Sequence, residues 1–157
     1  VDSHLELPVV TASREELTKH DFRPFAALAD LPLGMTAHLL YSALDPDHPA
    51  SMSKYIIDNV IRGYMGFDGL LFTDDLSMQA LGGDLGQRAA GALAAGCDVV
   101  LHCNGKRDEM QAVADACQGL SAKAESRWQR AIAWRGPSQP AHYDELLARL
   151  NDLLDIP

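Results

Sequence analysis

The sequence predicts an α/β fold in which helices cover a parallel sheet. Three short apolar stretches at residues 33–37, 69–72 and 98–101 show no alternation between apolar and polar positions. Strands that are buried on both faces have this continuous apolar character, and amphipathic segments of helical length separate the three stretches. The 157 residues are enough for one domain with its own hydrophobic core.

Composition and charge argue against several classes of protein. Hydrophobic residues make up 47% of the chain and charged residues 22%, which is the usual balance of a globular protein. The net charge of −9 would repel nucleic acids and anionic membranes, so neither is an expected partner. The chain has no apolar run of about 18 residues, and residues 1–6 do not resemble a signal peptide. We therefore expect a cytoplasmic location.

The cysteines indicate neither a disulfide framework nor a metal site. Cys97, Cys103 and Cys117 are odd in number, and no two of them have metal-ligand spacing. Free and mostly buried thiols in a reducing compartment are the expected state. No cofactor and no metal ion is expected from these residues.

The first part of the chain predicts a helix followed by a strand. Ser13 and the glutamate three positions later form a capping-box pattern, which predicts a helix over 14–29. Pro24 should interrupt or kink this helix, because proline has no backbone N–H to donate. The strand at 33–37 follows, and it ends at His38.

The middle of the chain predicts a loop, a helix and the second strand. Two prolines and two aspartates in 42–51 predict no regular element there. A helix is expected over 53–65, with one apolar stripe formed by Ile57, Val60, Ile61 and Tyr64. Gly66 stands where a helix-terminating glycine is expected, and the strand at 69–72 follows.

The last part of the chain is predicted to be mostly helical. Asp84 can cap a helix over 85–95, which Gly96 ends, and the third strand follows at 98–101. Three more helices are expected, at residues 107–117, 122–134 and 143–154.

Residues capable of chemistry follow all three predicted strands. These residues are His38, then Asp74 and Asp75, then His102 and Asn104. Because parallel strands bring their carboxyl ends to one edge of the sheet, we predict a functional site at this edge. A carboxylate with a proton donor suits glycosidic cleavage. The same residues also suit a metal-dependent hydrolase, with Asp74, Asp75, His38 and His102 as ligands. Spacing alone does not separate the two.

The N-terminus contains a second candidate pair, Asp2 and His4. In an extended segment their side chains project to the same side, so the carboxylate could hold one imidazole nitrogen and raise the basicity of the other. A chance pair at a chain end is the alternative.

Five segments together resemble glycoside hydrolase family 3, and within it the bacterial β-N-acetylhexosaminidases of peptidoglycan recycling. They are residues 2–8, 35–38, 66–69, 72–78 and 94–98. The resemblance covers the chain up to about residue 104. It implies a (β/α)8 barrel and a retaining exo-β-N-acetylglucosaminidase that acts on muropeptides through a covalent glycosyl-enzyme.

The resemblance also implies roles for individual residues. Asp74 would be the nucleophile, His4 the general acid and base, and Asp2 the residue that orients His4. His38 and Met78 would lie near the sugar. No role follows for Asp75, His102 or Asn104.

The chain departs from the family pattern in its extent. Only three of the eight strands are predicted, and the family's Lys-His and Pro-Gly-His-Gly segments are absent. The resemblance therefore implies the C-terminal part of the barrel, about strands six to eight, in one partial catalytic domain over 1–157. Its parts are a catalytic loop at 1–12, three strand–helix units at 13–104 and terminal helices at 105–157. The expected partner is the missing N-terminal half of the barrel, and an inactive fragment is the remaining alternative.

Overall fold

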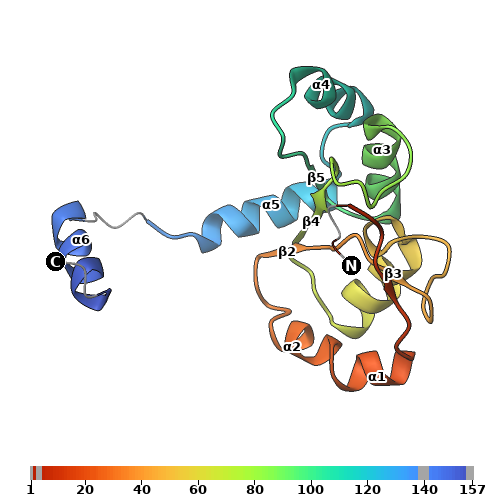
Figure 1. The fold of residues 1–157 in the computed structure, drawn as a ribbon, viewed down its shortest axis with the longest axis horizontal. Coiled ribbons are helices and arrows are strands. Elements are labelled where there is room, and N and C mark those ends of the chain that lie inside the picture. The colour runs from red at the N-terminus through yellow and green to blue at the C-terminus, as the bar shows by residue number, and fades with distance from the viewer. Residues whose placement is uncertain (1, 3–4, 138–141, 155–157) are drawn as a thin grey trace.

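The computed structural model describes residues 2, 5–137 and 142–154. Figure 1 shows the fold. In the described residues, five strands form two parallel sheets: β1 (Val9–Val10) pairs with β3 (Leu40–Tyr41), and β4 (Leu70–Asp75) lies between β2 (Leu33–Met35) and β5 (Val99–Leu101). The larger sheet confirms the three predicted strands and their parallel arrangement.

β4 is longer than the sequence predicted. The predicted strand ended at Phe72, but Asp75 still pairs with Leu101 of β5, so both acidic residues lie within the strand. The prediction ended the strand where polar residues begin, but hydrogen bonds to the neighbouring strand β5 extend it through these residues.

The small sheet was not predicted. Each of its strands has two residues, which is too short for any periodic pattern. The amide of Leu40 donates to the carbonyl of Pro8 at 3.0 Å, and the amide of Ser42 donates to Val10 at 3.1 Å. This pairing fixes the segment that follows the N-terminal candidate pair to the segment that follows His38.

The first predicted helix is two helices, α1 (Arg14–Lys19) and α2 (Phe22–Ala27). The capping box at Ser13 is confirmed. The break comes before Pro24 because a continuous helix would place the proline ring against the carbonyl four residues earlier. In α2, Pro24 is the third residue, where a missing N–H costs no intrahelical hydrogen bond.

The region after β3 also differs from the prediction. The predicted loop contains a 3-10 turn, η1 (Ala50–Met52), and the next helix, η2 (Ile56–Tyr64), is a π-helix. Its wider turns are visible in the hydrogen bond from the Met65 amide to the Val60 carbonyl at 2.8 Å. Because the period differs from that of an α-helix, Tyr64 leaves the buried stripe and is 47% exposed. Gly66 ends the helix with a φ of 73°, as predicted.

The remaining helices agree with the prediction to within a residue or two. They are α3 (Leu85–Ala95), α4 (Arg107–Ala116), α5 (Ala122–Trp134) and α6 (Tyr143–Leu153). Asp84 caps α3 and Gly96 ends it with a φ of 117°. Figure 1 shows α6 apart from the rest of the described chain, and its apolar residues are exposed.

The hydrophobic core lies between the sheet and the helices. Leu71 of β4 packs with Ile57 of η2 and Ala92 of α3, and the Phe67 ring completes this cluster. α3 also packs against α4, η1 and β5. On β2, Leu33 and Met35 are 51% and 58% exposed, so this edge of the sheet is only partly covered by the described residues.

A charged network joins α5 to the amino ends of β4 and β5. The carboxylate of Asp98 accepts from Arg62 at 2.8 Å and from Arg127 at 2.9 Å. Asp68 accepts from Arg127 and from Arg130. Asp68 and Asp98 belong to two of the family-like segments, 66–69 and 94–98, so these segments contribute to the fold at the end of the strands opposite Asp74.

Candidate functional site

The two adjacent carboxylates at the end of β4 have different surroundings. The carboxylate of Asp75 accepts from the Ser77 hydroxyl at 2.6 Å, the Ser77 amide at 3.0 Å and the Cys103 amide at 3.1 Å. Burial acts to raise the pKa of Asp75, but these hydrogen bonds outweigh it and hold the pKa below its usual value. Asp75 is therefore an ionised residue that ties β4 to the loop after β5.

Asp74 is the more open of the two. It is half-buried, and its Oδ1 accepts from the Asp75 amide at 2.8 Å. Among the described residues, no group donates a hydrogen bond to Oδ2. One carboxylate oxygen is thus held in place while the other can meet a reacting atom, which is the geometry that a carboxylate nucleophile needs.

A bulge in the sheet accompanies Asp74. Phe72 pairs with Val99 and Asp75 pairs with Leu101, so β4 advances three residues where β5 advances two. The hydroxyl of Thr73 accepts from the Leu101 amide at 2.9 Å and takes the place of a backbone carbonyl there. Bulges of this kind re-aim side chains beside active sites. The only sequence signal for this bulge is the threonine before the two acids, and the sequence analysis gave that residue no role.

His38 is 1% exposed and lies three residues beyond β2, which ends at Met35 and not at residue 37 as predicted. Its Nε2 is 3.0 Å from the Asp75 carbonyl, which can only accept, so Nε2 carries the proton. Its Nδ1 is 2.7 Å from the Ser51 hydroxyl and accepts from it. Burial lowers the pKa of His38 and outweighs the opposing effect of the Asp75 carbonyl. Both nitrogens are engaged, so neither is left for a sugar hydroxyl in this arrangement.

Met78 is buried, at 6% exposure, in the loop of residues 76–83. Sequence reasoning missed the residue that holds this loop, Arg88 of α3. Its Nη1 donates to the carbonyl of Leu76 at 2.7 Å and to that of Met78 at 3.1 Å. An arginine in a helix gives no local signal that its partners are carbonyls of a loop.

His102 and Asn104 meet at Glu109 of α4, another residue that sequence reasoning missed. Nε2 of His102 lies 3.0 Å from the Glu109 carboxylate, which also accepts from the Asn104 side chain. The hydrogen bond from Asn104, followed by those from His102 and Lys106, lowers the pKa of Glu109 to about 2. The structure therefore joins the end of β5 to α4 at this cluster.

The N-terminal candidate pair is described only in part. Asp2 is exposed, and its carbonyl accepts from the amides of Leu5 and Glu6 at 3.0 and 3.1 Å. His4 lies outside the described residues. The acid–base role of this pair stays a prediction.

Three of the four residues predicted as metal ligands are held by other partners, and Asp74 is held at one oxygen only. Asp75 is bound by Ser77 and Cys103, His38 by Ser51 and the Asp75 carbonyl, and His102 by Glu109. Within the described ranges, His, Cys, Asp and Glu side chains do not gather in any group of three or more that could hold a metal ion.

All three thiols are free; Cys97 is buried but Cys103 is exposed, against the expectation of mostly buried thiols.

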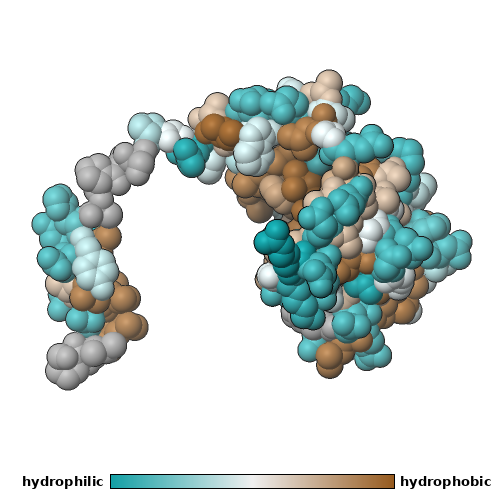
Figure 2. All heavy atoms as spheres, turned by 90° about the horizontal axis from the view of Figure 1, so that it is seen from above, coloured by the Kyte–Doolittle hydropathy of each residue, from teal (hydrophilic) through white to brown (hydrophobic). Residues whose placement is uncertain are grey.

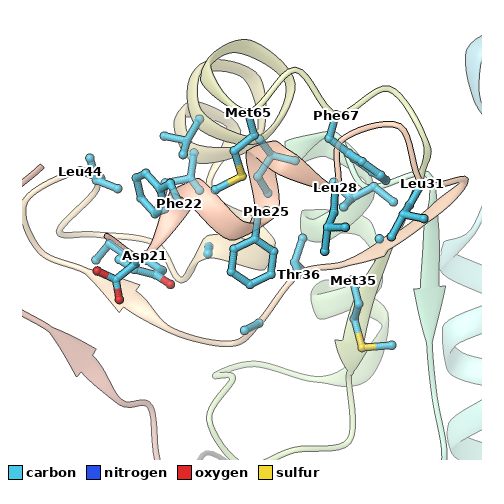
Figure 3. A pocket seen from close by; sticks show the side chains of 18 of the residues that line it. Asp21, Phe22, Phe25, Leu28, Leu31, Met35, Thr36, Leu44, Met65 and Phe67 are labelled. Carbon is cyan, nitrogen blue, oxygen red and sulfur yellow. The ribbon is translucent and has the colours of Figure 1, made fainter. Parts of the chain in front are cut away.

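A largely apolar cavity of about 470 Å³ lies between α2, β2 and η2. Figure 3 shows the side chains that line it, among them Phe22, Phe25, Leu28, Leu31, Met35, Met65 and Phe67. Phe25 and Leu28 on its wall are 65% and 54% exposed. The wall contains neither Asp74 nor His102, so this cavity is distinct from the polar edge of the sheet.

None of the helices in the described part of the chain is long and apolar enough to cross a membrane.

Comparisons with known proteins agree with this architecture. Residues 1–132 match the model of the glycosyl hydrolase family 3 N-terminal domain. A β-hexosaminidase of Alkalilimnicola ehrlichii is 50% identical over 107 residues, which are 66% of this chain and 30% of the relative. A β-hexosaminidase of Pseudomonas aeruginosa is 42% identical over 132 residues, which are 82% of this chain and 39% of the relative.

Solved structures show the same likeness. The family 3 β-N-acetylglucosaminidase of a Paenibacillus strain has a TM-score of 0.76 at 28% identity, and covers 90% of this chain and 30% of its own. NagZ of Neisseria gonorrhoeae, solved with N-trifluoroacetyl-D-glucosamine, has a TM-score of 0.70 at 34% identity, and covers 82% and 37%. The chain spans only 30% and 39% of the length of the two β-hexosaminidases it matches here. The chain belongs to glycosyl hydrolase family 3, and it matches the N-terminal domain of that family.

Proposed function

We propose that this chain contributes the nucleophile and the acid–base pair of a retaining exo-β-N-acetylglucosaminidase. The observation that carries the proposal is Asp74, a half-buried carboxylate at the end of β4 with one oxygen held by a backbone amide. The names of its relatives, β-hexosaminidase and β-N-acetylglucosaminidase, support the substrate class. The glucosamine derivative bound to the Neisseria relative supports it as well.

In the proposed mechanism, Asp74 attacks the anomeric carbon of a terminal N-acetylglucosamine. His4 donates its proton to the departing glycosidic oxygen, so the bond breaks as the glycosyl–Asp74 ester forms. His4 then takes a proton from water, which attacks the ester and releases the sugar with its configuration retained. Asp2 orients His4 and stabilises its charged form. Asp75 and His38 hold the backbone beside the nucleophile.

We further propose that β2, β4 and β5 are about the sixth to eighth strands of a (β/α)8 barrel. The partner is the missing N-terminal half of that barrel. Two features support this: β2 and β5 are the outer strands of the larger sheet, and the apolar cavity lies beside β2. A strand and helix added at β2 would cover Phe25, Leu28 and Met35.

The proposed physiological substrate is a peptidoglycan fragment in the cytoplasm. This part of the proposal rests on the family resemblance. The test of it is release of N-acetylglucosamine from purified muropeptides, compared with release from chitin oligosaccharides. Preference for the chitin oligosaccharides would contradict the role in peptidoglycan recycling.

The first prediction concerns Asp74 itself. The chain is joined to the N-terminal half of the Pseudomonas relative, and release of a chromophore from an aryl β-N-acetylglucosaminide is measured. We expect turnover in the joined polypeptide and little in the chain alone. Asp74→Asn should lower kcat by at least about a thousandfold, since amide oxygen is a poor nucleophile.

The matched control is Asp58→Asn, which changes an exposed acid of η2 that pairs with Lys54. It should leave kcat unchanged. Full activity of the Asp74→Asn variant, or loss of wild-type activity on addition of a chelator, would contradict the proposed mechanism.

A further inference from the structure

One guanidinium group holds the loop that follows the nucleophile. Arg88 of α3 is half-buried, and it donates to four backbone carbonyls of residues 76–83. Nη1 reaches Leu76 at 2.7 Å and Met78 at 3.1 Å, and Nε reaches Gly83 at 3.1 Å and Gly82 at 3.4 Å. Both ends of the loop are thus fixed to the same side chain.

The chemistry of these contacts is specific to arginine. A planar guanidinium presents several N–H donors at fixed angles, whereas an ammonium is a single point of charge. Among the described residues, Arg88 forms no ion pair, and the four groups that accept from it are neutral carbonyls of this loop.

The loop is connected to Asp74 through a short stretch of backbone. The Asp75 carbonyl accepts from His38 Nε2 and from the Met78 amide, at 3.0 and 3.1 Å. The next carbonyl, that of Leu76, accepts from Arg88. Two side chains, one from the loop after β2 and one from α3, therefore hold consecutive backbone carbonyls directly after the nucleophile.

We propose that Arg88 is a positioning residue for Asp74, acting through the backbone of residues 76–83. This inference rests on the proposed glycosidase function. Loss of Arg88 frees the Leu76 and Met78 carbonyls and lets the end of β4 shift. Small displacements of a reacting group lower kcat strongly, while the binding of the distant parts of the substrate is retained.

The first measurement is amide hydrogen exchange on the 157-residue chain. In Arg88→Ala, the amides of Met78 and Leu81 should exchange about tenfold faster or more, while those of α3 and β4 keep their protection. Arg88→Lys, which keeps the charge but loses the fork, should give a smaller increase. The matched control is Arg130→Ala, which removes a guanidinium from a carbonyl at the other end of the sheet, that of Asp68. It should leave loop 76–83 unchanged.

The second measurement is activity in the joined polypeptide. Arg88→Ala should lower kcat about tenfold or more with KM within about twofold, and millimolar guanidinium, but not urea, should restore part of kcat. Unchanged loop exchange, exchange that rises equally at all amides, or an unchanged kcat would overturn the proposal. A third outcome is faster loop exchange in Arg88→Ala together with no turnover in the joined wild-type polypeptide. It would contradict the glycosidase proposal alone, and it would still show that Arg88 holds the loop.

Discussion

At the scale of single residues, the hydrogen-bond partners of each polar side chain at the end of β4 decide which of them is open to a substrate. In the sequence, Asp74, Asp75 and His38 look equivalent, because each is a polar residue that follows an apolar stretch. The structure shows that Asp75 and His38 are bound to neighbouring protein groups while one oxygen of Asp74 is not. The partner of His38, Ser51, comes from a segment that the sequence predicted to be an irregular loop. Contacts between distant segments carry no local signal, so the division of roles could not be predicted.

His38 leads to a prediction about stability and pH. Its folded-state pKa lies below the usual value of 6.5, so the unfolded chain binds the proton more readily. The stability from neutral His38 is therefore present above pH 6.5 and is lost as the pH falls below it, towards the folded-state pKa. Urea unfolding from pH 8 to pH 5 should show this loss in the wild-type chain and a flatter profile in His38→Gln.

His38→Ala should cost about 1–3 kcal/mol at pH 8, because the Ser51 hydroxyl and the Asp75 carbonyl lose their buried partner. His20→Gln, at an exposed histidine, is the control and should keep the wild-type profile. An identical pH profile for the wild type and His38→Gln would contradict the buried neutral state.

At the scale of elements, local signals were sufficient where helix ends are set locally. Asp84 and Gly96 mark the two ends of α3 as predicted, because capping and a positive φ depend on adjacent residues. The sequence could not predict the π-helical turns of η2, whose hydrogen bonds differ from those that an apolar stripe implies. The predicted interruption at Pro24 is confirmed, and the chain makes it by starting a new helix at Phe22.

The close packing of the Phe67 ring beside β2 and β4 depends on two glycines, Gly34 and Gly69, which have no side chain. A Cβ at Gly34 would lie 2.7 Å from the Phe67 ring, and one at Gly69 would lie 2.6 Å from both that ring and the Leu31 carbonyl. Gly34→Ala should therefore force the buried Phe67 ring to move and cost about 1–3 kcal/mol of unfolding free energy. Thermal and urea unfolding measure this cost.

Gly119→Ala is the matched control, because nothing lies within 4 Å of its added Cβ. It should change stability by no more than about 0.5 kcal/mol. Equal stability of the Gly34→Ala and wild-type proteins would show that Phe67 does not pack closely on β2.

At the scale of the whole molecule, the parallel sheet and its helices followed from the apolar stretches and their spacing. The network around Asp98 did not, because its three partners, Arg62, the Leu71 amide and Arg127, come from η2, β4 and α5. The segments that resemble the family have two structural roles. Residues 72–78 form the candidate site, whereas residues 66–69 and 94–98 stabilise the opposite end of the strands.

The uncovered apolar surface leads to the last prediction. Figure 2 shows apolar atoms reaching the surface among hydrophilic ones, including on α6. Beside β2, Phe25 is 65% exposed and Met35 58%. Burial of such surface yields about 25 cal/mol per Å², so copies of the chain alone should associate through it as the concentration rises. Sedimentation velocity over a range of concentrations measures this association.

The double variant Phe25→Lys and Met35→Lys should stay monomeric at concentrations where the wild type associates, because buried charges oppose contact at this surface. It should also fail to assemble with a separately supplied N-terminal half, since the same surface is proposed to receive that half. Met110→Lys on α4 changes a residue that is 51% exposed and does not line the cavity, and it should behave as the wild type in both assays. If the double variant assembled normally with the added half, the proposed barrel contact at β2 would be wrong. If the double variant still self-associated like the wild type, association through α6 would become the better explanation of self-association.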